Sequence, residues 1–146
     1  MEMMEIRIPV TELTRALNIL QGVVQRKNTM PILSNVLLQV EGADKIFLTS
    51  TDLDVAMRLK KNCEVLSQGG ITVSARSLLD IVKMLPGPDV TLKELPNQQL
   101  SIRSGRTTAK LMTMSALEYP VLPAQEGMTF QEVEADLFLM MVQKTL

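Results

Sequence analysis

Residues 70–114, GITVSARSLLDIVKMLPGPDVTLKELPNQQLSIRSGRTTAKLMTM, decide the fold because their hydrophobic period changes within one short stretch. Residues 70–74 predict a strand, and residues 75–85 place apolar side chains at helical spacing before Pro86, Gly87 and Pro88 end the helix. Residues 89–95, 99–103 and 107–114 predict three further strands, separated by the turn strings PNQ and SGR. The segment therefore predicts a β-α-β-β-β unit.

The first half of the chain shows the same order of elements. Residues 5–9 predict a strand, and residues 11–25 predict a helix whose first residue, Thr11, is expected to cap it. Its apolar stripe is formed by Leu13, Ala16, Leu17, Leu20 and Val24. Residues 34–40, 45–50 and 55–65 predict three strands. Residues 1–115 therefore predict an α+β domain of two β-α-β-β-β units, with both helices on one face and antiparallel sheets on the other.

The remaining residues predict a linker and the beginning of another unit. Residues 116–129 contain Pro120, Pro123 and Gly127 and have little periodicity, as is typical of a linker. Residues 130–135 predict a strand, and residues 136–146 predict a helix capped by Asp136. A strand and an apolar helix need partners to pack against, so we expect residues 130–146 to be a truncated second domain of a longer protein.

The composition excludes several classes of function. The chain contains no histidine, which excludes Ser-His-Asp and Cys-His catalysis and zinc sites with imidazole ligands. It contains no glycine-rich phosphate-binding motif, and we expect no cofactor. Its one cysteine, Cys63, fits a reducing cytoplasm, and no segment has the length of a membrane span, so we expect a soluble cytoplasmic protein. The formal net charge of −1 argues against tight, purely electrostatic DNA binding.

Four segments resemble one known family: residues 28–40 (NTMPILSNVLLQV), 49–53 (TSTDL), 71–86 (ITVSARSLLDIVKMLP) and 102–120 (IRSGRTTAKLMTMSALEYP). They resemble the first domain of the beta subunit of bacterial DNA polymerase III, the beta sliding clamp, and residues 130–146 resemble the start of its second domain. The resemblance implies a non-catalytic processivity factor, in which two three-domain chains form a ring around duplex DNA. It also implies that polymerase and clamp loader bind through later domains, so we expect residues 1–146 to lack that pocket and to form no ring alone.

The resemblance also implies which cations face DNA. Lys27, preceded by Arg26, occupies a position where the family usually has a DNA-contacting arginine, and Arg76 matches another such arginine. Independently of the family, Arg76 and Lys83 share one polar stripe of the predicted second helix with Asp80. Arg15 on the first helix is a weaker candidate. Without the resemblance, these residues would be interpreted as solvated cations with weak ion pairs. A ring that cannot leave DNA needs only weak, sequence-independent phosphate contacts. A DNA-binding role is therefore compatible with the low net charge of the chain.

Four further residues correspond to the surface that closes the ring in the family. Ile81 and Leu111 match apolar interface positions. Ala109 stands where a larger apolar residue is common, and Ser77 stands where a cation is common. These two departures make the strength of this interface an open question.

Two other functions stay open on the sequence alone. Asp52 and Asp54 suggest an acid and base for a carboxylate-based hydrolase, or a metal site, although two carboxylates without further ligands suit Mg²⁺ poorly. A structural turn is the simpler interpretation of this string. A protein-interaction module without a nucleic-acid partner is the other alternative. The sliding clamp differs from it in requiring Arg15, Lys27, Arg76 and Lys83 on one surface.

Overall fold

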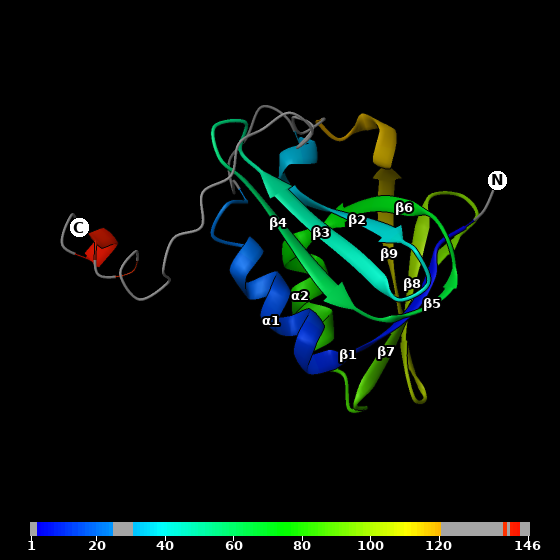
Figure 1. The fold of residues 1–146 in the computed structure, drawn as a ribbon. Coiled ribbons are helices and arrows are strands. Elements are labelled where there is room, and N and C mark those ends of the chain that lie inside the picture. The colour runs from blue at the N-terminus through cyan, green and yellow to red at the C-terminus, as the bar shows by residue number, and fades with distance from the viewer. Residues whose placement is uncertain (1–2, 25–30, 121–138, 140, 144–146) are drawn as a thin grey trace.

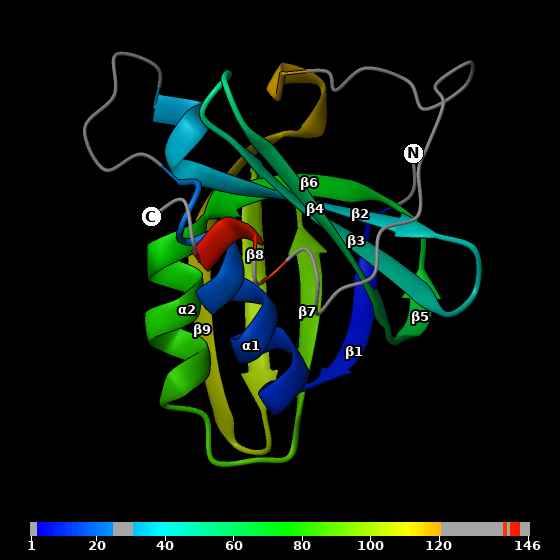
Figure 2. The ribbon, with the colours of Figure 1, turned by 60° about the vertical axis from the view of Figure 1, so that its left-hand side comes forward.

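A computed structural model describes residues 3–24, 31–120, 139 and 141–143 of the chain. Two helices lie side by side on one side of a nine-stranded antiparallel sheet, as the two views show (Figure 1, Figure 2). This arrangement confirms the predicted α+β class. Among the described residues, no helix is long and apolar enough to cross a membrane.

The elements follow the predicted order. The first unit comprises β1 (Glu5–Pro9), α1 (Val10–Leu20), the 3-10 turn η1 (Pro31–Ser34), β2 (Asn35–Glu41), β3 (Lys45–Thr51), β4 (Ala56–Asn62) and β5 (Glu64–Ser67). The second comprises β6 (Gly70–Ser74), α2 (Ala75–Lys83), β7 (Asp89–Leu95), β8 (Gln99–Ser104), β9 (Thr107–Ser115) and the 3-10 turn η2 (Ala116–Glu118).

The two units exchange their first strands. The sheet order is β4-β3-β2-β6-β9-β8-β7-β1-β5, so β6 of the second unit pairs with β2 of the first, and β1 pairs with β7. Both pairings are antiparallel, with Val36 opposite Val73 and Ile6 opposite Leu92. The units therefore form one interlocked domain, because neither sheet half is complete without a strand from the other unit.

The predicted strand over residues 55–65 is wrong as a single element. It is divided at Cys63 into β4, which pairs with β3, and β5, which pairs with β1. The backbone N–H of Cys63 donates to the carbonyl oxygen of Asp44 over 2.9 Å, outside the regular strand ladder. The chain from β4 to β5 thus pairs first with β3 and then with β1. Strand β9 does likewise, because its residues through Met112 pair with β8 and those from Thr113 pair with β6.

The expected start and end of the first helix are also wrong. Helix α1 begins at Val10 directly after β1, and no side chain caps it, so Thr11 lies inside the first turn. The Val10 N–H donates instead to the carbonyl oxygen of Pro88 over 2.8 Å. The helix ends at Leu20, where tightened turns precede Gly22, a residue that is unfavourable in a helix interior.

The main core lies between the helices and the sheet. It buries four residues of the predicted stripe, Leu13, Ala16, Leu17 and Leu20, together with Leu78, Leu79 and Val82 of α2. Val24, beyond the end of α1, is only partly buried. Each fully buried aliphatic side chain contributes about 1.5–3 kcal/mol relative to exposure. A smaller cluster of Ile32, Leu33, Leu37 and Tyr119 holds the segment after β9 against the domain. The predicted linker over residues 116–129 therefore begins with residues that pack on the first domain, and residues 121–138 lie outside the described part.

Candidate nucleic-acid interface

The exposed sides of the two helices form the candidate interface. Strand β1 leads into α1 and β6 leads into α2, and the start of α1 is bonded to Pro88, just beyond the end of α2. The helices therefore run antiparallel, as Figure 2 shows. A hollow of about 450 Å³ lies between them, and its lining includes Arg15 of α1 and Lys83 of α2. Two of the predicted DNA-contacting cations thus border the same hollow.

Arg15 is held loosely. Its side chain is 67% exposed, and its Nη1 lies 3.4 Å from the Oε1 of Glu12, one turn earlier. Glu12 is shared, because its other carboxylate oxygen lies 3.3 Å from the Nζ of Lys61 on β4. An exposed pair of this kind is worth less than about 1 kcal/mol. Phosphate oxygens could therefore replace Glu12 as the partner of Arg15 at little cost.

Helix α2 presents Arg76 and Lys83 to solvent. Both side chains are exposed, as is Asp80, so the polar stripe predicted from their spacing lies on the outer side of the helix. Within the described part of the chain, the side chains of Arg76 and Lys83 have no hydrogen-bond or ion-pair partner. The start of α2 is fixed by Ser74, whose Oγ accepts a hydrogen bond from the Ser77 N–H over 3.3 Å.

Arg26 and Lys27 lie outside the described residues, in the segment that follows α1. Three of the five predicted cations, Arg15, Arg76 and Lys83, therefore have defined positions. All three lie on the two adjacent helices, on the side away from the core.

The predicted ring-interface residues lie on α2 and β9, which pack against each other. All four are partly buried, and Ile81, Ala109 and Leu111 also contact the main core. A feature beside them was not predicted from the sequence. Strand β9 pairs with β6 only from Thr113, so among the described residues the stretch from Thr107 to Met112 has a partner strand on one side alone. Such an edge can pair with another strand.

The Asp52 and Asp54 string forms a tight turn between β3 and β4. Asp52 Oδ1 accepts hydrogen bonds from the backbone N–H groups of Asp54 and Val55, over 3.0 and 2.6 Å. Thr51 Oγ1 accepts from the Leu53 N–H and donates to the Val55 carbonyl. These bonds hold Leu53 at a φ of +77°, which is costly for a side chain of its size. The Asp52 carboxylate therefore serves the backbone of the turn, while Asp54 is exposed.

Cys63 is partly buried at the break between β4 and β5. Burial, with a smaller contribution from the carboxylate of Asp44, raises the pKa of its thiol from 9.0 to about 11. The thiol is therefore protonated at neutral pH and is a poor nucleophile. Among the described residues, no group of three or more Cys, Asp or Glu side chains has a metal-binding arrangement.

Known proteins resemble the chain in both sequence and structure. The family model described as the N-terminal domain of the DNA polymerase III beta subunit matches residues 4–123. The beta sliding clamp of Pseudomonas putida is 34% identical over 134 residues, which cover 91% of this chain and 36% of the relative. That of Caulobacter vibrioides is 34% identical over 144 residues, which cover 97% and 38%. The chain thus spans little more than a third of these relatives.

Solved structures show the same likeness. The DNA polymerase sliding clamp from Caulobacter crescentus matches with a TM-score of 0.78 and 36% sequence identity, over 84% of this chain and 34% of that one. The DNA polymerase III beta chain from Streptococcus pneumoniae matches with a TM-score of 0.89 over 96% of this chain and 39% of that one. At 22% identity, the second match bears on the fold alone.

Proposed function

Because the chain belongs to the family of the DNA polymerase III beta subunit, we propose that it supplies the first domain of a sliding clamp. The whole clamp would encircle duplex DNA in the cytoplasm, act as a non-catalytic processivity factor and hold the replicative polymerase on its template. The observation that carries the proposal is the pair of antiparallel helices, which places Arg15 and Lys83 around one hollow and Arg76 on the same exposed side.

The proposed contact is with phosphates and is independent of base sequence. Arg15, Arg76 and Lys83 lie along the exposed sides of two adjacent helices, an arrangement that suits contacts with phosphates and not the insertion of one helix into a groove. Arg26 and Lys27 follow α1 in the sequence, and we include them in the same interface. A few exposed cations give weak binding that falls steeply with salt. Weak contacts suit a ring, because topology rather than affinity keeps it on DNA.

The proposed ring contact uses α2 and the free edge of β9. Ile81 and Leu111 would supply apolar surface, and the backbone of residues 107–112 would pair with a strand of the neighbouring domain. Ala109 would supply less apolar surface than the larger residue common at this position in the family, and Ser77 would lack the positive charge common at its position. Polymerase and clamp loader would bind through the later domains.

A salt titration with duplexes of unrelated sequence tests the proposed DNA contact. The five cations of the proposed interface predict a slope of log affinity against log salt of about −4.5. Changing Lys27 and Arg76 to Ala should weaken binding equally for each duplex and bring the slope closer to zero by about 2. A strong preference for one duplex sequence, or an unchanged slope in the double variant, would contradict the proposal.

A further inference from the structure

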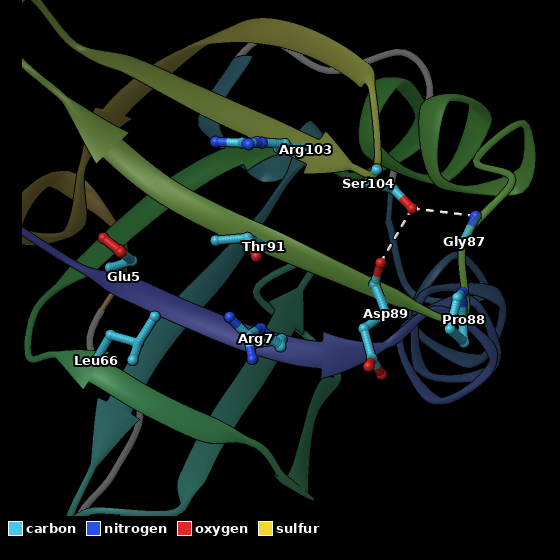
Figure 3. Close-up of a pocket in the computed structure, with 10 residues that line it drawn as sticks. Glu5, Arg7, Leu66, Gly87, Pro88, Asp89, Thr91, Arg103 and Ser104 are labelled. Carbon is cyan, nitrogen blue, oxygen red and sulfur yellow. Dashed lines mark hydrogen bonds between the residues drawn. The ribbon is translucent and has the colours of Figure 1, made fainter.

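A second polar hollow lies on the opposite side of the sheet from the helices. It has a volume of about 580 Å³, and its lining includes Arg7 of β1, Leu66 of β5, Thr91 of β7 and Arg103 of β8 (Figure 3). The flanking residues Ile6, Ile8, Leu92 and Ile102 are buried in the core. Because side chains alternate along a strand, Arg7, Thr91 and Arg103 point outward, away from α1 and α2.

The strand register places these side chains in one row. Arg7 is opposite Thr91, and Thr91 is opposite Arg103. With strands about 4.8 Å apart, the two arginine Cα atoms are about 10 Å apart, with the threonine hydroxyl between them. Figure 3 shows the three side chains in that order across β1, β7 and β8. Two guanidinium groups flanking a hydroxyl can together bind one or two carboxylates.

A second row, two residues further along the strands, continues the pattern. Lys93 is opposite Ser101, and Ser101 is opposite Lys110. The second row begins on β1 with Glu5, which is opposite Lys93. From β7 to β9, the cations Lys93 and Lys110 of this row flank the Ser101 hydroxyl, as Arg7 and Arg103 flank Thr91 in the first row. The two rows can therefore contact more than one residue of an extended acidic chain.

The cations differ in how firmly they are held. The Arg103 side chain is exposed and has no ion-pair or hydrogen-bond partner among the described residues. Arg7 Nη1 lies 3.2 Å from the Oε2 of Glu64, but both side chains are at least half exposed, so the pair is weak. Glu5 is paired loosely with Lys93 at 3.9 Å. Asp89 lies two residues before Thr91 on β7, at the end of the hollow, where its backbone carbonyl accepts a hydrogen bond from Ser104 and its carboxylate points toward β1 (Figure 3).

Leu66 and the absence of aromatic residues favour a peptide over a nucleic acid. Leu66 is 48% exposed at the edge of the hollow and offers an apolar contact on the β5 side, near Glu5 (Figure 3). Strands β1, β5, β7, β8 and β9 contain no Phe, Tyr or Trp on which bases could stack. We propose that this hollow binds an acidic peptide segment of a partner protein, with carboxylates between Arg7 and Arg103 and an apolar side chain on Leu66.

A peptide titration of the 146-residue chain tests the proposal. The probe is a short peptide of alternating glutamate and glycine with one leucine, and its binding is followed by the amide shifts of β1, β7 and β8. Replacing Arg103 by Gln should weaken binding by about tenfold, the effect of one charge-assisted hydrogen bond. Glu64→Gln should strengthen it, because the substitution removes the carboxylate that competes for Arg7.

The control is Lys60→Gln, which removes one exposed cation from β4 on the other half of the sheet. It should leave the affinity for the peptide unchanged. Equal losses of affinity in the Lys60 and Arg103 variants would mean that binding depends on net charge alone, and would overturn the proposal. A peptide with glutamine in place of glutamate should not shift these amides, and equal binding of it would also overturn the proposal. A thymidine oligonucleotide should bind the hollow more weakly than the acidic peptide, and equally tight binding would mean that the hollow does not select peptides.

Discussion

The backbone N–H of Val10 donates a hydrogen bond to the carbonyl oxygen of Pro88 over 2.8 Å, joining the start of α1 to the segment that follows α2. The bond takes the place of a side-chain cap at the start of α1. It also fixes the position of α1 along its axis relative to the antiparallel α2. Arg15 lies about one and a half turns from Val10, and Lys83 is the last residue of α2. The same bond therefore brings the two cations to one hollow.

The cap of α2 should contribute measurably to stability. Ser74→Ala removes the acceptor of the Ser77 N–H and should lower the free energy of unfolding by about 1 kcal/mol. Ser77→Ala is the matched control, because the hydrogen bond uses the backbone of Ser77 and its side chain is not required. Urea unfolding of both variants measures the difference. Equal losses would show that the cap has no special role.

The Asp52 turn predicts a clear difference between two neighbouring carboxylates. Asp52→Ala leaves the N–H groups of Asp54 and Val55 without their acceptor and should cost about 1–2 kcal/mol. Asp52→Asn keeps an acceptor oxygen and should recover most of that loss. Asp54→Ala should change the unfolding free energy by less than about 0.5 kcal/mol, since its side chain is exposed. If Asp54 proved as important as Asp52, the structural interpretation of this string would fail.

Tyr119 can be titrated alone, because the chain has one tyrosine and no tryptophan. Burial raises the pKa of its phenol from 10.0 to about 12, although a hydrogen bond with the backbone of Thr51 lowers the pKa and so opposes the shift. Phenolate absorbance should therefore rise with a midpoint near pH 12 in the folded chain and near pH 10 in denaturant.

The same shift predicts how stability depends on pH. Since the folded pKa of Tyr119 is above the unfolded value, its contribution is complete below pH 10 and is lost as the pH rises towards 12. Tyr119→Phe should make the fall in stability between these pH values shallower, while the remaining slope includes the thiol of Cys63. A folded-state phenol midpoint near pH 10 would mean that Tyr119 is not buried as described.

Local sequence signals predicted most elements but not their pairing. The bounds of β1, β6 and β7 agree with the residues expected from periodicity and turn strings. The division at Cys63 was missed, because residues 55–65 alternate as one strand and the change of neighbour is a tertiary effect. Exchange of first strands between the units was missed for the same reason. Thr11 was misassigned because the acceptor at the helix start, Pro88, is far away in the sequence.

The candidate sites were predictable to different degrees. Helical spacing and the family resemblance selected Arg15, Arg76 and Lys83, since each signal is local to one helix, and their contacts with DNA stay a prediction. The row of Arg7, Thr91 and Arg103 could not be found in this way, because its members come from three strands whose register is set by long-range pairing. Ile81 and Leu111 as ring contacts stay a prediction, as do the domain boundaries and the roles of Arg26 and Lys27.

If the helix side of the domain faces duplex DNA, removing charge in pairs should distinguish the two sides of the sheet. Arg15→Ala with Lys83→Ala removes the two cations of the hollow between the helices. Arg103→Ala with Lys93→Ala removes one arginine and one lysine from the opposite side of the sheet and matches the change in net charge. Fluorescence anisotropy with a labelled duplex at low salt should show weaker binding and a slope closer to zero by about 2 for the first pair, and unchanged binding for the second. Equal losses in both pairs, or a larger loss from the sheet pair, would mean that the helix side is not the DNA-facing side.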